Sequence, residues 1–213
     1  MNWNDITVQQ FQELHRINSD HTLDDMDRAT RTIGILYNKS EKEVDEMEYI
    51  EFGKLSRACS FLLVNEVPGK AVKSIKVAGK KYAIPYNISE LKYRQYVEVI
   101  SFSNNVIENL HNILASIVQP VRFGFKTKNK VEDHAKIAEV MKDASIVDVY
   151  HSCVFFCKLF IGSIEAITKG CLERKIQMNT EKMMEMMILL RDSKNAMDGC
   201  IPPNAQPITK GSL

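Results

Sequence analysis

The chain has 213 residues, of which 45% are apolar and 26% charged, and its formal net charge is +1. These values are ordinary for a globular protein and exclude collagen-like, disordered and disulfide-scaffold classes. The length allows one large domain or two small ones with a real core. The balanced total gives no general attraction to nucleic acid or to an anionic membrane.

The near-neutral total hides two halves of opposite charge. Residues 1–66 carry 7 basic and 13 acidic side chains, whereas residues 67–213 carry 21 basic and 14 acidic ones. Solvated faces tolerate either sign, so chance scatter explains this asymmetry as well as function does. The alternative is a head-to-tail attraction between copies or partners, which salt would weaken.

The cysteines and the N-terminus indicate a reducing compartment. Five cysteines form no disulfide framework or zinc pattern, and the first residues contain no secretory signal. We therefore expect a cytoplasmic protein. The most apolar window, residues 144–164, contains Asp148, His151 and Lys158, so we expect a buried core helix and no membrane span.

The first helices are predicted from caps and apolar spacing. Thr7 and Gln10 have the form of a capping box, and apolar residues at three-residue steps predict a helix over 8–17. Thr22 is the expected cap of a second helix, over 23–37, whose first turn is rich in aspartate.

Two more helices are expected before the first proline. Ser40 and Glu43 form a second capping box and open a short helix that ends near Met47. Apolar residues then recur at helical spacing over 48–64. Pro68 stops this series of helices.

The pattern changes to a period of two around Gly79. Alternating apolar residues flank the turn Ala78-Gly79-Lys80, which predicts a β-hairpin over about residues 71–86. Pro85 cannot donate to a strand ladder, so the second strand should end there or lie at an edge.

Helical spacing returns at Ser89 and predicts a bundle. One helix is expected over 91–100, another from Val106 to its end at Pro120, and a loop over 121–130. The remaining helices are expected over 131–142, 146–169 and 180–197. The fold class is therefore mainly α, a multi-helix bundle with one small β-hairpin.

The order of these predicted elements divides the chain into four parts. We expect an N-terminal segment of short helices over 1–66, a hairpin connector over 67–88 and a C-terminal helical bundle over 89–198. Residues 199–213 contain three prolines and little apolar mass, which is typical of a mobile tail.

No motif in the sequence indicates catalysis or a cofactor. Cys153 and Cys157 are four residues apart near His151 and could share a metal, but their phenylalanine-rich surroundings favour a core role. The five histidines match no metalloprotease motif, and the glycines form no phosphate loop. The acidic residues of 43–51 have the spacing of a solvated helix face. We therefore expect no enzyme, no metal and no cofactor.

Two segments could contact partners. A basic segment interleaved with Phe123 and Phe125 resembles single-strand-binding chemistry, but a nucleic-acid binder needs a basic face and one short loop does not supply it. Its basic residues are Arg122, Lys126, Lys128 and Lys130. The last predicted helix is rich in methionine, which suits either an adaptable protein-binding surface or core filling. Its methionines include Met183, Met184, Met186 and Met187.

Two stretches together resemble a known family. The first contains ITVQQFQEL at 6–14, IGILYNKSEKEVD at 33–45, FGKL at 52–55 and FLL at 61–63. The second contains the hairpin, LKYRQYVE at 91–98, the apolar helix ending at Pro120 and VYHSCVFF at 149–156. In pattern and order, residues 5–168 resemble the tail assembly chaperones of long-tailed bacteriophages and prophages of gut bacteria.

The resemblance implies a non-catalytic protein that binds the long tape-measure protein and helps tail-tube subunits assemble around it. It implies no cofactor, a host-cytoplasmic location and absence from the finished virion. Homo-oligomers are a further expectation, and neither membrane nor nucleic acid is expected as a partner. An apolar groove between helices should receive the tape-measure helix. Its expected contacts are Phe155, Phe156, Met183, Met184 and Met187.

Other classes stay open at this point. One alternative is a structural component of the virion, such as a neck or tail-completion protein. A less favoured alternative is a nucleic-acid-binding accessory protein. The residues after 178 lie outside the resemblance.

Overall fold

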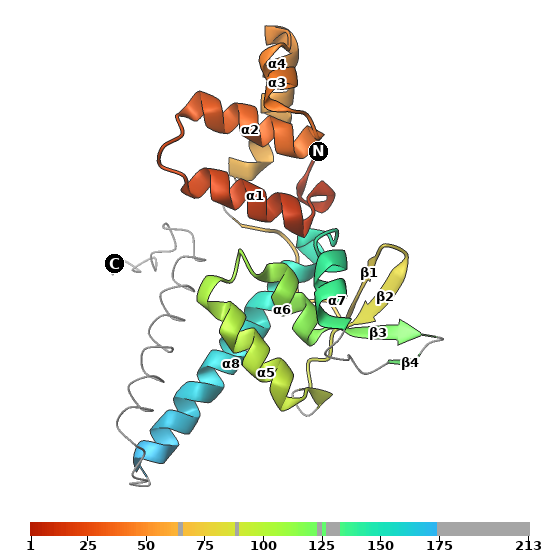
Figure 1. The fold of residues 1–213 in the computed structure, drawn as a ribbon, viewed down its shortest axis with the longest axis vertical. Helices are drawn as coiled ribbons and strands as arrows, with labels where there is room; N and C mark the ends of the chain where they lie inside the picture. Colours follow the sequence, from red (N-terminus) through yellow and green to blue (C-terminus); the bar gives the residue numbers. More distant parts are fainter. Residues whose placement is uncertain (64–65, 88–89, 123–124, 127–132, 174–213) are drawn as a thin grey trace, which may run out of the picture.

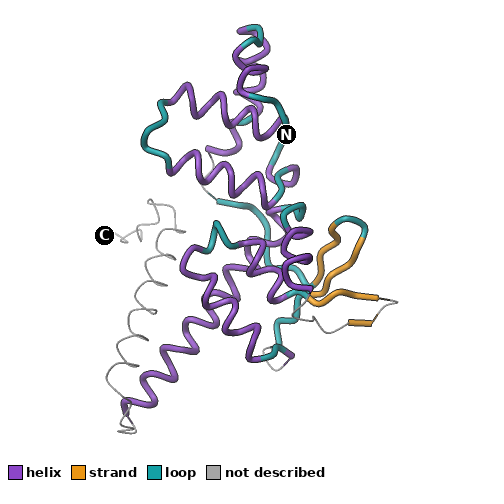
Figure 2. The backbone as a smooth tube through the Cα atoms, viewed as in Figure 1, coloured by secondary structure: helices purple, strands orange, loops and turns teal. Residues whose placement is uncertain are grey.

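The computed structural model describes residues 1–63, 66–87, 90–122, 125–126 and 133–173. The described chain is mainly helical with one small antiparallel sheet, which confirms the predicted fold class. Figure 1 shows the N-terminal helices at one end of an elongated molecule, and Figure 2 shows the strands gathered at the side of the helical bundle.

Short helices form the N-terminal end. Two antiparallel helices, α1 and α2, pack against each other, and the shorter α3 and α4 follow (Figure 1). The bounds are η1 Trp3–Asp5, α1 Val8–Ser19, α2 Asp25–Tyr37, α3 Glu41–Asp45, α4 Tyr49–Ala58 and η2 Ser60–Leu63.

The capping boxes predicted at Thr7 and Ser40 are confirmed. The Thr7 hydroxyl accepts from the Gln10 N–H at 3.2 Å, and the Gln10 side chain accepts from the Thr7 N–H at 3.1 Å. The predicted cap of α2 is wrong. Asp24 caps that helix, because its carboxylate accepts from the N–H groups of the two residues at the helix start.

The helix predicted over 48–64 is shorter than expected. α4 ends at Ala58, and the chain continues as the 3-10 helix η2. α4 has no buried residue, so little packing supports a longer helix.

The predicted hairpin is confirmed, but the sheet is larger than the hairpin. β1 (Ser74–Val77) and β2 (Lys80–Ala83) pair around the turn Ala78-Gly79. β3 (Gln119–Arg122) and β4 (Phe125–Lys126) extend the sheet in the order β1-β2-β3-β4.

The prediction of a loop over 121–130 is therefore wrong where the chain forms the short strands β3 and β4. α6 ends at Ile117, and the chain around Pro120 pairs with β2, with Pro120 opposite Tyr82. Proline lacks an N–H for the ladder and argues against a strand inside a sheet. For this reason β3 could not be recognised from local pattern.

Four α-helices make the bundle. They are α5 Tyr93–Phe102, α6 Leu110–Ile117, α7 His134–Met141 and α8 Ile146–Glu173, with the 3-10 turn η4 Ser103–Asn105 after α5. The predicted helix over 180–197 and the predicted tail over 199–213 lie outside the described residues.

α6 and α8 supply the centre of the core. Within α6, Leu110, Ile113 and Leu114 are completely buried. Along α8, Val149, Cys153, Phe156 and Phe160 recur at steps of four and three and are buried. Ile146–Ile164 has the length and apolar composition of a membrane span, and this packing agrees with the prediction of a core helix.

Hydrogen bonds join α1 to the bundle at the α7–α8 junction. The Val8 N–H donates to Ala144 O at 2.9 Å, and the Gln9 N–H donates to Lys142 O at 3.0 Å. The first N–H groups of a helix have no partner within it, so these two bonds satisfy the start of α1. They also cross the boundary that we placed at residue 66, and the division into domains stays a prediction.

Candidate functional site

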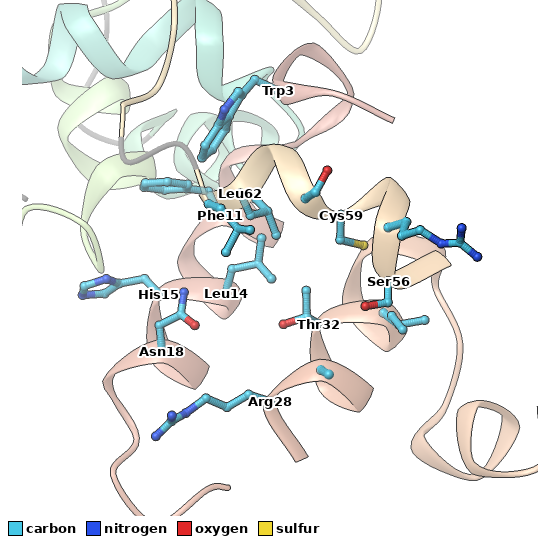
Figure 3. A pocket seen from close by; sticks show the side chains of 15 residues that line it. Trp3, Phe11, Leu14, His15, Asn18, Arg28, Thr32, Ser56, Cys59 and Leu62 are labelled. Atoms are coloured by element: carbon cyan, nitrogen blue, oxygen red, sulfur yellow. The ribbon is translucent and has the colours of Figure 1, made fainter. Parts of the chain in front are cut away.

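A groove of about 530 Å³ lies between α1, α2 and the α4–η2 segment (Figure 3). Exposed residues such as Asn18, Arg57 and Leu63 line it together with buried ones, so the groove reaches the surface. Its volume is in the range of about 300–1,000 Å³ typical of ligand sites. We call this feature the N-terminal groove.

Residues at helical spacing on α1 and α2 form two walls of the N-terminal groove. Phe11, Leu14, His15 and Asn18 lie on one face of α1, because residues three and four apart share a helix face. On α2 the corresponding residues are Arg28, Ala29, Thr32 and Ile33. The third wall comes from the end of α4 and from η2, and includes Ser56, Arg57, Cys59, Ser60, Leu62 and Leu63.

One end of the groove is aromatic and aliphatic. The Trp3 ring meets the Phe61 ring edge-on at 5.6 Å between centroids and lies 6.3 Å from the Phe11 ring. Leu14 and Leu62 complete this apolar end in Figure 3. Edge-to-face pairs of this kind fix the positions of aromatic rings, so this end is a preformed apolar surface.

The other end is polar. Figure 3 places Arg28, His15 and Asn18 there. The Arg28 guanidinium donates to Asp20 O at 3.1 Å and pairs with Asp25 at 3.3 Å. These contacts hold a cationic side chain at the end of the groove away from Trp3.

Two lining residues carry a buried donor that has no hydrogen-bond partner among the described residues. These donors are Trp3 Nε1 and Arg28 Nε. Most buried N–H groups in proteins have a partner. Both donors are themselves shielded from the groove, so an acceptor on a bound molecule reaches them only if the neighbouring side chains move.

The thiol of Cys59 faces the same groove (Figure 3). Burial raises the pKa of this thiol above its ordinary value, so it stays protonated at neutral pH. Thiolates are the nucleophilic form of cysteine, and Cys59 is thus a poor nucleophile. It behaves as an apolar part of the wall.

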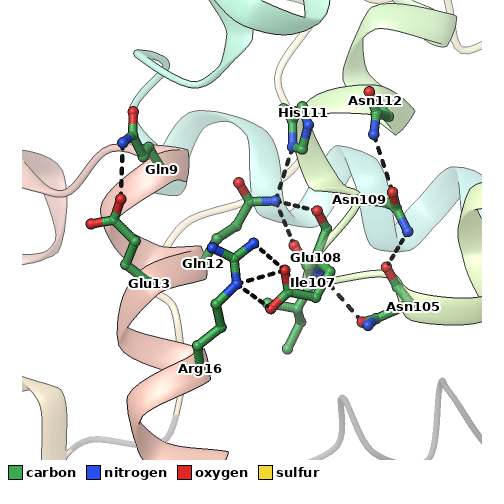
Figure 4. A network of polar contacts seen from close by, with 10 residues as sticks. All are labelled: Gln9, Gln12, Glu13, Arg16, Asn105, Ile107, Glu108, Asn109, His111 and Asn112. Atoms are coloured by element: carbon green, nitrogen blue, oxygen red, sulfur yellow. Dashed lines mark hydrogen bonds and ion pairs between the residues drawn. The ribbon is translucent and has the colours of Figure 1, made fainter.

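A polar network behind α1 fixes this wall to the bundle (Figure 4). The buried Gln12 amide donates to Ile107 O and Glu108 O, both at 2.8 Å, and contacts His111 Nδ1 at 3.0 Å. On the neighbouring turn, Arg16 Nε donates to the Glu108 carboxylate at 2.8 Å. The face of α1 opposite this network therefore has a fixed orientation toward the groove.

The predicted partner contacts lie elsewhere. Phe156 is completely buried and stacks on Tyr86 at 5.6 Å, which places it in the core and out of a partner's reach. Phe155 is 39% exposed and meets Tyr86 edge-on. The predicted contacts Met183, Met184 and Met187 lie outside the described residues.

Two positions of the predicted basic segment lie in strands of the sheet. Arg122 ends β3 and lies opposite Phe125, whereas Lys126 ends β4 and lies opposite Val121. Phe125 in β4 is 78% exposed. Lys128 and Lys130 lie outside the described residues.

The cysteine pair of α8 has the predicted core role. Cys153 and Cys157 are both buried, and burial raises the pKa of the Cys153 thiol well above its ordinary value. His151 contacts Val67 O through Nε2 at 3.0 Å. In the described part of the chain, no three histidine, cysteine or acidic residues gather as metal ligands would.

The N-terminal groove was not predicted from the sequence. The apolar spacing that predicts the helices over 8–17 and 23–37 is the same for a stripe that faces a groove as for one that faces a core. The available signal was polar residues inside the stripes, since His15 and Asn18 continue the Phe11–Leu14 face of α1. No protein-family model, curated protein or solved structure matches this chain.

Proposed function

We propose that this chain is a non-catalytic tail assembly chaperone of a long-tailed phage. In this proposal it holds an amphipathic helix of the tape-measure protein in the N-terminal groove and assists assembly of the tail-tube subunits around it. It acts in the host cytoplasm, without a cofactor, and leaves before the virion is finished.

The observation that carries the proposal is the graded lining of the groove. An amphipathic helix presents apolar side chains at steps of three and four residues, which suits the surface formed by Trp3, Phe11 and Leu62. The polar edge of such a helix, with an acidic or amide side chain, suits the polar end of the groove, where Arg28, His15 and Asn18 lie. A helix docked in this way would cover the exposed Leu63 as well.

The chemistry of the groove favours binding over catalysis. Its cysteine has a raised pKa, and Arg28 is held by Asp20 and Asp25. Apart from His15, Asn18 and Arg57, the rest of the lining is apolar or hydroxyl-bearing and suits the exclusion of water from an apolar partner. Covering the exposed apolar face of a long helix is what keeps such a chain soluble.

The test is co-expression with the tape-measure protein, followed by measurement of its soluble fraction and of co-purification. Ala29 is half-buried and lines the groove, so Ala29→Gln fills the groove with little effect on the fold. We expect this variant to retain about tenfold less partner, corresponding to about 1.4 kcal/mol of binding free energy.

Asp27→Gln is the matched control, because Asp27 is exposed on the same helix and does not line the groove. It should co-purify with as much partner as the wild type. Equal co-purification by Ala29→Gln and wild type would show that the groove is not the binding site.

A further inference from the structure

The sheet carries a concentration of positive charge that the proposed function does not use. Residues 67–87 contain five lysines and no acidic residue, and the described residues of β3 and β4 add the positions of Arg122 and Lys126. The structure makes β2 and β3 neighbouring strands. The hairpin lysines therefore lie on strands next to the positions of Arg122 and Lys126.

The strand register aligns these charges. Directly opposed residues in antiparallel strands point to the same face, and Lys76 lies opposite Lys81. Lys81 is in turn opposite Val121, and Val121 is opposite Lys126. One row across the four strands thus holds three lysine positions, at about 4.8 Å per strand.

These lysines are available to a ligand. The five side chains of the hairpin region are exposed and form no ion pair with a described residue. They are Lys70, Lys73, Lys76, Lys80 and Lys81. The nearest acidic positions along the chain, Glu66 and Glu90, lie outside the hairpin.

A cleft continues this surface onto α7. It has a volume of about 370 Å³ and lies between the sheet and α7. Lys80, Lys81 and Lys136 line it, together with one acidic residue, Asp133. The net charge around the cleft is therefore positive. Phe125 at the far edge of the sheet is exposed, but its position opposite Arg122 places it on the other face from the row of Lys76 and Lys81.

We propose that this sheet and the cleft beside it bind the phosphate backbone of nucleic acid. The exposed lysines supply the attraction to phosphate. The requirement for a basic face, which the loop alone did not meet, is met once the hairpin lysines lie beside β3.

The size of the surface favours this partner over a second copy of the chain. A face three strands wide and four residues long covers about 200 Å², whereas a stable protein interface needs about 800 Å² from each partner. Binding to a phosphate backbone depends on the number of neutralised charges. The acidic N-terminal segment of another copy is the competing occupant, and the experiment below separates the two.

The test is fluorescence anisotropy of a labelled single-stranded DNA of about 20 nucleotides with the full chain. For five phosphate contacts, the apparent Kd should rise about 100-fold between about 50 and 200 mM salt, because each contact on a single strand contributes about 0.7 to the logarithmic slope. Lys76→Glu with Lys81→Glu should bind more weakly at low salt and reduce that rise to about 20-fold.

The matched control is Lys54→Glu with Lys158→Glu, which changes the net charge equally at exposed lysines outside the sheet. It should keep the wild-type salt slope. Thermal melting checks that both variants fold, and Lys76→Gln with Lys81→Gln replaces the first variant if it does not.

Three results would overturn the proposal. The first is absence of binding at low salt with about 100 µM protein, the upper range of non-specific Kd values. The second is an equal loss in both charge-reversed variants. The third is salt-sensitive self-association that Lys76→Glu with Lys81→Glu abolishes while DNA does not bind, which would assign the sheet to a second copy. Co-purification of the tape-measure protein is independent of all three.

Discussion

Gln12 in α1 donates through its side-chain amide to the main-chain carbonyl of Ile107, at 2.8 Å, across 95 positions of sequence. The same amide nitrogen reaches Glu108 O and His111 Nδ1. A single buried side chain therefore connects the groove-bearing N-terminal helices to the bundle.

We expect Gln12→Ala to destabilise the fold by about 1–3 kcal/mol, because the carbonyls of Ile107 and Glu108 lose a buried donor. Urea unfolding measures this loss. Gln9→Ala is the control, since Gln9 is exposed on the same helix and, among the described residues, its side chain bonds only to Glu13. Its cost should stay below about 0.5 kcal/mol, and equal costs in the two variants would contradict the role given to Gln12.

The two-residue turn of the hairpin should respond in opposite ways to two substitutions. Ala78 has φ +47° and Gly79 has φ +74°, and a left-handed conformation costs a residue with a side chain about 1–2 kcal/mol. Ala78→Gly relieves this cost, so we expect a net stabilisation of up to about 1 kcal/mol after the greater freedom of glycine in the unfolded chain.

Gly79→Ala should destabilise by about 1 kcal/mol through backbone strain alone, because nothing lies within 4 Å of the added Cβ. Thermal unfolding of both variants gives the comparison. A lower melting temperature for Ala78→Gly than for the wild type would contradict the turn geometry.

His111 should make stability depend on pH on the acid side of neutrality. Its pKa is lowered chiefly because burial disfavours the imidazolium, with Lys142 as a further cause. Gln12 Nε2 lies 3.0 Å from Nδ1, and an amide nitrogen cannot accept, so a proton on Nδ1 would set two donors against each other. Below the ordinary pKa of about 6.5, the unfolded chain binds a proton that the folded chain does not.

The free energy of unfolding should therefore decrease as the pH falls below about 6.5, until the folded-state pKa is reached. Denaturant unfolding between about pH 7.5 and pH 5 measures this slope. His111→Gln should flatten it, whereas His21→Gln, in the exposed α1–α2 connection, should not. An unchanged slope in His111→Gln would contradict the assignment.

Phe155 and Phe156 are neighbours in sequence, but replacing each by alanine should reduce the stability of the fold by different amounts. Phe156 is completely buried between Tyr86 and Phe160, so Phe156→Ala should cost about 3–5 kcal/mol. Phe155 is 39% exposed, and Phe155→Ala should cost about 1 kcal/mol. Chemical denaturation distinguishes them, and comparable costs would contradict the burial of Phe156.

Local pattern predicted the elements of this fold where caps and periodicity act within a few residues. The capping boxes at Thr7 and Ser40 and the turn at Gly79 are such cases. The sheet extension was not predictable, because β3 contains a proline and its ladder depends on β2, which is 36 or more positions earlier. The choice of Asp24 over Thr22 as cap was also decided by nearby competition, since Thr22 bonds to Asp20 instead.

The candidate site was less predictable for a physical reason. A groove is made by the way in which three helices meet, and neither Phe11 nor Ile33 differs in spacing from a core residue. The basic surface is similar, since Lys81 and Lys126 become neighbours of Val121 only through strand pairing. Both features depend on contacts between segments that are distant in the sequence.

The central claim is that the N-terminal groove receives a helix of the tape-measure protein. Hydrogen exchange of the chain, with and without a soluble tape-measure fragment, tests it most directly. We predict protection at Asn18 on α1, at Thr32 on α2 and over 56–62, with little change in α5. Protection confined to the helix faces around Phe155 and Tyr93, with unchanged exchange along α1 and α2, would contradict the claim.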